Sequence, residues 1–286
     1  MSQNKLEDLL VQASQKLKNE GAGEYQLDAK LFMMKATGFT KVQLFTKNDY
    51  CLNNNEAEEF WDMVNKRAKR IPTQYIIGSC QFMGLDFLVS QAVLIPRSDT
   101  EILVETILEY KKSNEINSIM DIGTGSGCIL ISLLHYGINN AIAVDISDDA
   151  IEVAKKNAAL NKVLDRIKFI NSNLFEVLGE EYYGQFDVIV SNPPYIAKNV
   201  IKGLMSEVKD YEPMIALDGG DDGLDFYKKI IPQGKKYLSA RGWMFFEIGY
   251  DQGVAVSNLL KAEGFEKIEV IKDLAGLDRV VLGKIV

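Results

Sequence analysis

The sequence predicts an α/β protein with a doubly wound, mostly parallel sheet, preceded by a small helical bundle and a β-hairpin. From about residue 98 onward, short apolar runs alternate with segments of helical period. A glycine-rich stretch, residues 123–127, separates the first of these runs from its helix. Two β-rich runs at 267–271 and 279–282 leave no room for a crossover helix, so we expect an antiparallel last strand.

Residues 1–72 have the pattern of a helical domain. One buried helix face is indicated by apolar residues at i, i+3, i+4 and i+7 spacing, namely Leu6, Leu9, Leu10, Ala13 and Leu17. Two further helices are expected, one ending near Gly38 and one spanning about 57–68 before Ile71 and Pro72. We interpret the basic cluster of Lys66, Arg67, Lys69 and Arg70 as a solvent-exposed helix end that complements the helix dipole.

Residues 73–97 are predicted to form a β-hairpin that links the helical domain to a domain spanning 98–286. Segments 75–78 and 81–84 are rich in β-formers and are punctuated by glycine. Leu85, Phe87 and Val89 then alternate with the two-residue period of a strand.

The domain 98–286 is expected to open with a helix around 102–107. The predicted strands of its sheet are 118–121, 141–145, 168–170, 186–190, 243–247, 267–271 and 279–282. The predicted intervening helices are 129–134, 149–161, 224–238 and 254–262. Strands that alternate with helices in this way imply parallel pairing with helices on both faces.

Composition narrows the classes of partner. The chain has 32 Lys and Arg against 40 Asp and Glu, a formal charge of −8, which disfavours a protein that grips nucleic acid by many phosphate contacts. Its three scattered cysteines and single histidine indicate neither a disulfide framework nor a metal site. No stretch of 18 apolar residues occurs, and the N-terminus is polar, so we expect a cytoplasmic protein without a membrane segment.

The glycine-rich stretch indicates a nucleoside cofactor. Gly123, Thr124, Gly125, Ser126 and Gly127 lie between a strand and a helix, where glycine allows close backbone approach and the helix N-terminus presents free N–H groups. The spacing is GxGxG, not the GxGxxG of the dinucleotide fingerprint. This difference weakens the case for a nicotinamide cofactor, which nevertheless remains an alternative.

Two other strand ends favour the same kind of ligand. Asp145 ends the second strand about twenty residues beyond the loop, where its carboxylate can accept hydrogen bonds from both ribose hydroxyls. Asn173 and Leu174 follow the third strand and are candidates for contacts with an adenine ring, although local turn chemistry explains them nearly as well.

Asn192, Pro193, Pro194 and Tyr195 follow the fourth strand and form the candidate catalytic motif. Ligands of open α/β sheets bind at this end of the strands. Asn192 Oδ1 and the Pro193 carbonyl can accept the two hydrogen bonds of a planar NH₂ group, with the ring of Tyr195 against its face. Such a nitrogen is a poor nucleophile. Hydrogen-bond acceptors that bind it more strongly in the transition state than in the ground state would speed its attack, which explains the residue types of this motif. Asn192 is also expected to touch the cofactor.

Taken together, the 121–127 loop, Asp145 and the 192–195 motif resemble class I amino-methyltransferases. Three further stretches, 93–101, 212–224 and 72–78, are similar to the VLIPRPETE, EP…AL.GG.DGL and P..YI.G patterns of the HemK/PrmC family. Ser98 and Asp99 replace the family's Pro-Glu, and Asn173 and Leu174 stand where Asp and Trp occur. The resemblance implies a class I methyltransferase fold and S-adenosylmethionine as cofactor. It also implies N5-methylation of the glutamine in the Gly-Gly-Gln motif of class I peptide chain release factors, with the helical domain docking that partner.

Three alternatives remain at this point. Methylation of exocyclic amines of DNA or RNA bases uses the same motif, and the acidic chain disfavours it. A nicotinamide oxidoreductase would need a hydride-transfer site, for which no Ser/Tyr/Lys or His constellation stands out. A binding module without activity is disfavoured by the intact Asn192.

Overall fold

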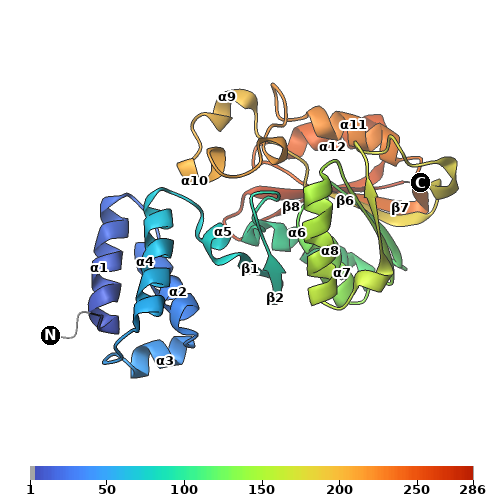
Figure 1. The fold of residues 1–286 in the computed structure, drawn as a ribbon. Helices are drawn as coiled ribbons and strands as arrows, with labels where there is room; N and C mark the ends of the chain where they lie inside the picture. Colours follow the sequence, from blue (N-terminus) through green and yellow to red (C-terminus); the bar gives the residue numbers. More distant parts are fainter. Residues whose placement is uncertain (1–3, 286) are drawn as a thin grey trace. The chain divides into compact units, whose positions relative to one another are not determined.

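The computed structural model describes residues 4–285 and divides into two compact units. The first unit contains the chain up to Gly78 together with Met205–Tyr211. The second contains Ser79–Leu204 and the chain from Glu212 onward. Figure 1 shows the elements of each unit coloured along the sequence.

The first unit is built from helices. They are α1 (Leu6–Asn19), α2 (Tyr25–Thr37), α3 (Lys41–Thr46), α4 (Asn54–Ala68), α5 (Thr73–Ile77) and α10 (Ser206–Lys209). Four of the five apolar residues predicted to form the α1 face are buried, namely Leu6, Leu9, Ala13 and Leu17. They pack with Phe32 and Phe60 in the core of the unit. A capping box between Asn53 and Glu56 starts α4, since each side chain bonds the other's backbone N–H.

Residues 75–77 of the segment 75–78 lie in helix α5, so the prediction of this segment as β-rich was wrong. Pro72 stands directly before the helix, where its fixed φ and missing N–H cost nothing. Gly78 ends it in the left-handed conformation at φ 83°. These two end signals override the preference of Tyr75, Ile76 and Ile77 for strands.

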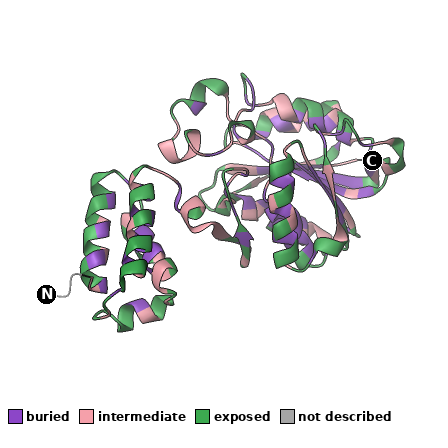
Figure 2. Ribbon diagram, in the orientation of Figure 1, coloured by how far each residue is buried: buried purple, intermediate pink, exposed green. Residues whose placement is uncertain are grey.

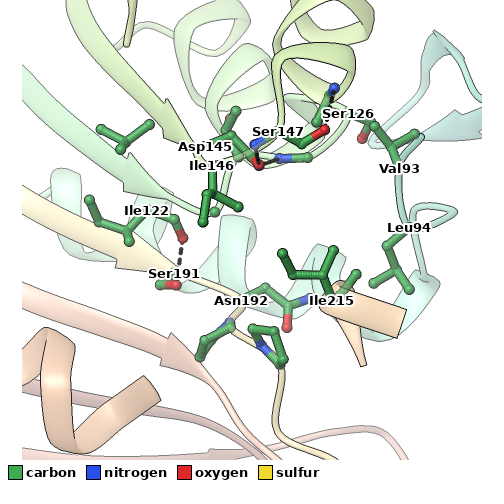
Figure 3. Close-up of a pocket in the computed structure, with 18 of the residues that line it drawn as sticks. Val93, Leu94, Ile122, Ser126, Asp145, Ile146, Ser147, Ser191, Asn192 and Ile215 are labelled. Carbon is green, nitrogen blue, oxygen red and sulfur yellow. Dashed lines mark hydrogen bonds between the residues drawn. The ribbon is translucent and has the colours of Figure 1, made fainter. Parts of the chain in front are cut away.

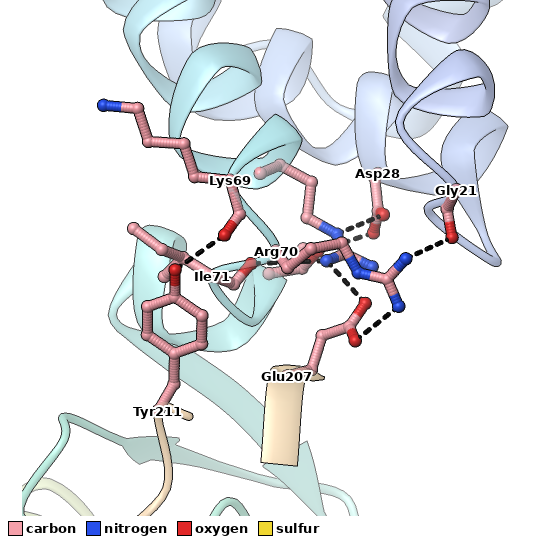
Figure 4. A network of polar contacts seen from close by, with 9 residues as sticks. Gly21, Asp28, Lys69, Arg70, Ile71, Glu207 and Tyr211 are labelled. Atoms are coloured by element: carbon pink, nitrogen blue, oxygen red, sulfur yellow. Dashed lines mark hydrogen bonds and ion pairs between the residues drawn. The ribbon is translucent and has the colours of Figure 1, made fainter. Parts of the chain in front are cut away.

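The interpretation of the basic cluster as solvent-exposed was wrong for Arg67, which is buried. Its Nε donates to Asp28 Oδ2 at 2.8 Å, and its Nη1 donates to Glu207 Oε1 at 2.9 Å. Arg70 donates to the other oxygen of Glu207 at 2.6 Å (Figure 4). Arg67 falls on the same helix face as Phe60 and Val64, so it points toward the core, where Asp28 supplies the opposite charge.

The second unit contains a seven-stranded sheet in the order β5-β4-β3-β6-β7-β9-β8. Its strands are β3 (Ser118–Ile122), β4 (Asn140–Asp145), β5 (Ile167–Asn171), β6 (Phe186–Ser191), β7 (Leu238–Glu247), β8 (Glu266–Lys272) and β9 (Asp278–Lys284). The first five pair in parallel, and β9 runs antiparallel to both of its neighbours. This confirms the predicted doubly wound sheet with an antiparallel last strand.

Helices cover both faces of this sheet (Figure 1). They are α6 (Ser98–Lys111), α7 (Cys128–His135), α8 (Asp148–Leu160), α11 (Asp225–Gly234) and α12 (Gly253–Ala262). Alternate residues of β6 pack on opposite sides: Val188 and Val190 join the cluster under α6 and α7, and Ile189 joins the one under α11 and α12. Figure 2 shows buried residues concentrated in the central strands of the sheet.

A two-stranded antiparallel hairpin, β1 (Ser79–Phe82) and β2 (Leu85–Leu88), precedes the sheet and confirms the predicted hairpin. Between β6 and β7 lie three short elements that the sequence pattern did not predict: α9 (Lys198–Ile201), the helix α10 of the first unit, and a 3₁₀ turn at Met214–Ala216. Among residues 4–285, no helix combines the length and the apolar character that crossing a membrane requires.

Candidate active site

A cavity opens at the carboxyl ends of the central strands of the second unit. The chain winds outward from β3 through β4 to β5, and then returns to place β6 on the other side of β3. The loops after β3 and β6 therefore leave adjacent strands at the point where the strand order reverses, which is where open α/β sheets bind ligands. Figure 3 shows Asp145 and Asn192 on opposite sides of this cavity.

The glycine-rich loop joins β3 to α7 and forms one wall of the cavity. The N–H groups of Gly123 and Thr124 both donate to the Val144 carbonyl, at 2.8 and 3.0 Å, which fixes the loop to the neighbouring strand. Gly127 adopts φ +79°, and a Cβ there would lie 2.8 Å from Cδ1 of Ile131. Only glycine fits this turn into the helix.

Asp121 lies behind the loop and is fully buried. Its Oδ2 accepts a hydrogen bond from Thr124 Oγ1 at 2.8 Å, whereas Oδ1 has no donor among the residues that the structure describes. Burial raises the pKa of Asp121 to about 7, although the Thr124 hydroxyl opposes that shift. The residue supports the loop from within and does not line the cavity.

Asp145 ends β4 and places its carboxylate at the cavity. Its Oδ2 accepts from the backbone N–H of Gly125 at 2.8 Å, and its Oδ1 accepts from that of Ser147 at 3.0 Å. Burial raises the pKa of Asp145, and these N–H donors act in the opposite direction. The following helix is capped by Ser147 and not by Asp145, because Ser147 Oγ accepts from the N–H of Ala150. Asp145 is therefore not needed as the helix cap.

Asn173 and Leu174 follow β5 and also line the cavity. Leu174 has φ +51°, an uncommon conformation for a residue with a large side chain. The amide of Asn173 is exposed and donates to Glu176 Oε1 at 2.6 Å. Leu174 thus offers an apolar surface, while the Asn173 side chain is engaged in its own turn.

Asn192, Pro193 and Pro194 directly follow β6 and line the cavity. Ser191, just before them, is buried and donates from Oγ to the Ile122 carbonyl at 2.6 Å, which ties the ends of β6 and β3 together. Asn192 Nδ2 donates to Thr100 Oγ1 at 3.3 Å. Among residues 4–285, no main-chain donor reaches the carbonyls of Asn192 or Pro193, so both oxygens remain available to a ligand.

The loop after Asn192 packs on a second loop that carries Gly219. Ile196 N donates to the Leu217 carbonyl at 3.1 Å, and Gly219 N donates to the Ile196 carbonyl at 2.9 Å. A Cβ at Gly219 would lie 2.7 Å from Cα of Tyr195 and 2.8 Å from the carbonyl oxygen of Pro194. The glycine therefore lets the two backbones touch, which explains the small residue in this stretch.

Two of the predicted site residues do not line the cavity: Gly127 and Tyr195. Gly127 acts through the turn described above. The Tyr195 hydroxyl points to Glu247 Oε1 at 3.3 Å, and its ring packs against the core under α11 and α12. The other predicted cavity residues are brought together around one space: Gly123, Thr124, Gly125, Ser126, Asp145, Asn173, Leu174, Asn192, Pro193 and Pro194.

The structure adds lining residues that the sequence analysis did not assign. The cavity is completed by Leu94, Arg97, Thr100, Ile215, Phe226 and Ile230, together with neighbours of these residues. Leu94, Arg97 and Thr100 fall in the stretch 93–101 that resembles a family pattern, which was the available signal. Phe226 and Ile230 were indistinguishable from the apolar face of a core helix.

This sheet, with a glycine loop, a strand-end acid and an Asn-Pro-Pro-Tyr motif around one cavity, defines a methyltransferase of the class I, Rossmann-like fold. Solved methyltransferases share the fold. The chain resembles the hMettl16 catalytic domain, in complex with the MAT2A 3'UTR hairpin 6, with a TM-score of 0.54 and 24% identity over 70% of this chain and 76% of that one. It resembles the human methyltransferase 10 domain containing protein with a TM-score of 0.50 and 25% identity, over 71% and 90% of the two chains.

The chain belongs to the release factor glutamine methyltransferase family. It is 44% identical to the release factor glutamine methyltransferase of Clostridium acetobutylicum over 97% of this chain and 98% of the relative. It is 40% identical to that of Geobacter sulfurreducens, over 94% and 93%. The family model described as the PrmC N-terminal domain matches residues 8–78, and that described as ribosomal protein L11 methyltransferase (PrmA) matches residues 98–213. The family expected from the sequence motifs is thus confirmed.

Proposed function

We propose that this protein transfers the methyl group of S-adenosylmethionine to the side-chain amide nitrogen of a glutamine in a class I peptide chain release factor. The observation that carries the proposal is that Asn192, Pro193 and Pro194 line the same cavity as the glycine loop and Asp145. A target nitrogen held by the first group would thus lie next to a nucleoside cofactor held by the second. The family's named substrate then supplies the identity of the target.

The cavity lining fits S-adenosylmethionine. The Asp145 carboxylate would accept hydrogen bonds from the ribose hydroxyls, exchanging its present bond with Gly125 for one of them. Apolar side chains at three neighbouring strand ends, Ile122, Val144 and Leu174, suit a flat aromatic base. The first turn of α7 offers free N–H groups to a carboxylate. When bound, S-adenosylmethionine supplies an electrophilic methyl carbon.

The Asn192 motif supplies what an amide nucleophile lacks. The lone pair of an amide nitrogen is delocalised, so the nitrogen attacks poorly. Asn192 Oδ1 and the Pro193 carbonyl accept its two N–H groups and hold it in line with the methyl group. As the nitrogen pyramidalises, these N–H groups become more acidic, so the hydrogen bonds strengthen in the transition state. Alignment of the reactants can contribute about 7–11 kcal/mol to such a reaction.

The helical unit is proposed to dock the protein substrate. It carries exposed apolar side chains on α2 and α3: Leu27 at 50%, Val42 at 69% and Phe45 at 61% exposure. Exposed apolar side chains of this kind are typical of surfaces that bind a protein partner. No described residue of the helical unit lines the cavity proposed for the cofactor, which lies wholly in the other unit. Methylation of a nucleic-acid base uses the same nitrogen chemistry, and the net charge of −8 disfavours it.

The test is a methylation assay on the full chain with labelled S-adenosylmethionine, a purified class I release factor and, separately, DNA and RNA. We expect label on one glutamine of the release factor, located by mass spectrometry. Asn192→Ala should abolish the transfer while calorimetry shows cofactor affinity close to that of the parent. Asn139→Ala, an exposed asparagine at the opposite end of the strands, is the matched control and should be fully active. Label on nucleic acid alone, or a fully active Asn192→Ala, would refute the proposal.

A further inference from the structure

Among the described residues that line the cavity, Arg97 is the only one with a positively charged side chain. It belongs to the stretch 93–101, which contains one of the family patterns, and it directly precedes α6. Its Nη2 donates to Glu212 Oε1, and Glu212 opens the stretch 212–224, which contains another of these patterns. The ion pair therefore joins, at the cavity, two distant stretches of chain to which the methyl transfer assigns no task.

Glu212 holds the guanidinium of Arg97 at one end only. The Glu212 side chain is 1% exposed and the Arg97 side chain is 40% exposed, so the carboxylate lies inside while the guanidinium reaches the cavity. A guanidinium carries five N–H donors in a fixed, planar arrangement. Among residues 4–285, Glu212 is the only acceptor that the structure gives to Arg97. The ion pair thus fixes the direction of Arg97 and leaves donors available to a ligand.

The first turn of α6 lies on the side of the cavity that holds the Asn192 motif. Thr100 Oγ1 accepts from Asn192 Nδ2 at 3.3 Å. Asp99 Oδ2 lies 3.2 Å from Arg279 Nη2, and Arg279 belongs to β9. This turn therefore spans β6 to β9, away from β4 and β5, whose ends line the part of the cavity assigned to the nucleoside. Because Arg97 directly precedes the turn, it lies in the half of the cavity proposed for the substrate.

We propose that Arg97 donates to a main-chain carbonyl oxygen of the substrate peptide beside the target glutamine, and that Glu212 is the positioning residue that holds Arg97 for this contact. A peptide presents such carbonyls on both sides of the glutamine whatever its sequence, and hydrogen bonds from a charged donor are strong. The side-chain oxygen of the glutamine is a poorer choice. A cation on that oxygen would draw the amide lone pair toward it and make the nitrogen less nucleophilic. This role of Arg97 rests on the proposed function.

The test measures KM for the release factor, kcat and calorimetric cofactor affinity in variants of the full chain. Arg97→Met keeps an unbranched apolar side chain and removes the donors. KM should rise roughly tenfold to a hundredfold, as the loss of a hydrogen bond from a charged group implies. Both kcat and cofactor affinity should stay near the parent's, because such a contact binds the ground state and the transition state alike. Arg241→Met, at an exposed arginine near the start of β7, is the matched control and should change none of the three.

Three further variants separate binding from folding. Arg97→Met leaves a buried carboxylate without its partner, which costs stability. A chain with both Arg97→Met and Glu212→Leu leaves no such charge, should show the same rise in KM, and gives the answer if Arg97→Met does not fold. Glu212→Leu alone removes the anchor of Arg97 and should raise KM as well. Glu212→Gln keeps an acceptor oxygen for Arg97 and should recover most of the parent's KM.

The outcomes distinguish this inference from the proposed function. If the parent methylates release factor and Asn192→Ala does not, a parent-like KM in the folded Arg97 variants overturns the inference alone. Weaker cofactor binding would assign Arg97 to the carboxylate of S-adenosylmethionine, and a lower kcat with unchanged KM would show support of the loops only; each result overturns it too. A parent-like KM in Glu212→Leu, or equal losses in Glu212→Leu and Glu212→Gln, overturns the positioning role of Glu212. If Asn192→Ala is itself fully active, the proposed function fails and the inference fails with it.

Discussion

Arg67 Nε lies 2.8 Å from Asp28 Oδ2, and both side chains are almost completely shielded from water, at 8% and 7% exposure. Removing one partner leaves the other as an unpaired buried charge. We expect Arg67→Ala to lower the free energy of unfolding of the helical unit by about 3–5 kcal/mol. Denaturant unfolding followed by circular dichroism measures this. The exposed Lys66→Ala is the control, and equal stabilities of the two variants would contradict the expectation.

Asp145→Ala should weaken the binding of S-adenosylmethionine. Hydrogen bonds to a charged group contribute about 1.5–3 kcal/mol, so a roughly tenfold to hundredfold rise in Kd is expected. Titration calorimetry on the full chain measures it. Asp149→Ala, an exposed acid in the first turn of α8, should bind as the parent does. Unchanged affinity in Asp145→Ala would remove the carboxylate from the ribose site.

Gly219→Ala should lower kcat by at least tenfold, because the new methyl group would lie 2.7 Å from Cα of Tyr195 and must displace the loop that begins with Asn192. Catalysis is sensitive to misplacement of about 1 Å. Gly203→Ala is the matched control, since its Cβ would meet only the Val200 carbonyl, at 3.4 Å. Steady-state methylation of release factor reports the result, and a fully active Gly219→Ala would mean that the two loops can separate without consequence.

The stability of the protein should depend on pH through Asp121. Burial raises the pKa of Asp121 to about 7, above its ordinary 3.8, so the folded state binds this proton more tightly than the unfolded chain. The stability that Asp121 gives the folded state by holding this proton is therefore present at low pH and is lost as the pH rises from about 4 to about 7.

Asp121→Asn keeps an acceptor for Thr124 and removes the charge. We expect the variant to gain stability relative to the parent as pH rises through this window, by roughly 1–4 kcal/mol at pH 8. Thermal unfolding without cofactor, at pH 5 and pH 8, measures the difference. Asp149→Asn should show no such gain, and a constant difference between Asp121→Asn and the parent would contradict the prediction.

Most of the sheet could be predicted from the sequence because its strands are short, apolar and bounded by clear turns. The stretch 141–145 is an example, since it lies within β4 and its first four residues are buried. The loops after β3 and β6 were recognisable from their glycines and prolines. These two loops meet at one cavity because β3 and β6 are neighbours in the sheet. No local sequence pattern encodes that strand order.

The features that escaped prediction depend on tertiary contacts. Arg67 looks like any basic residue at a helix end, and only the distant Asp28 and Glu207 make its burial tolerable. Helices α9 and α10 have four residues each, too short to show a period. Thr100 reads as an ordinary helix residue until the fold places its Oγ1 3.3 Å from Asn192 Nδ2.

Because Met205–Tyr211 belongs to the helical unit, the chain passes between the units three times, after Gly78, Leu204 and Tyr211. Glu207 is held by Arg67 and Arg70, and Tyr211 donates to the Lys69 carbonyl at 2.6 Å. Removing the helical unit by a single cut after Gly78 would therefore separate segment 205–211 from its partners, so Glu207 would lose both arginines. A chimaera that contains the helical unit of a homologue must include both pieces of chain from that homologue. A truncated enzyme needs a neutral linker in place of the seven residues 205–211.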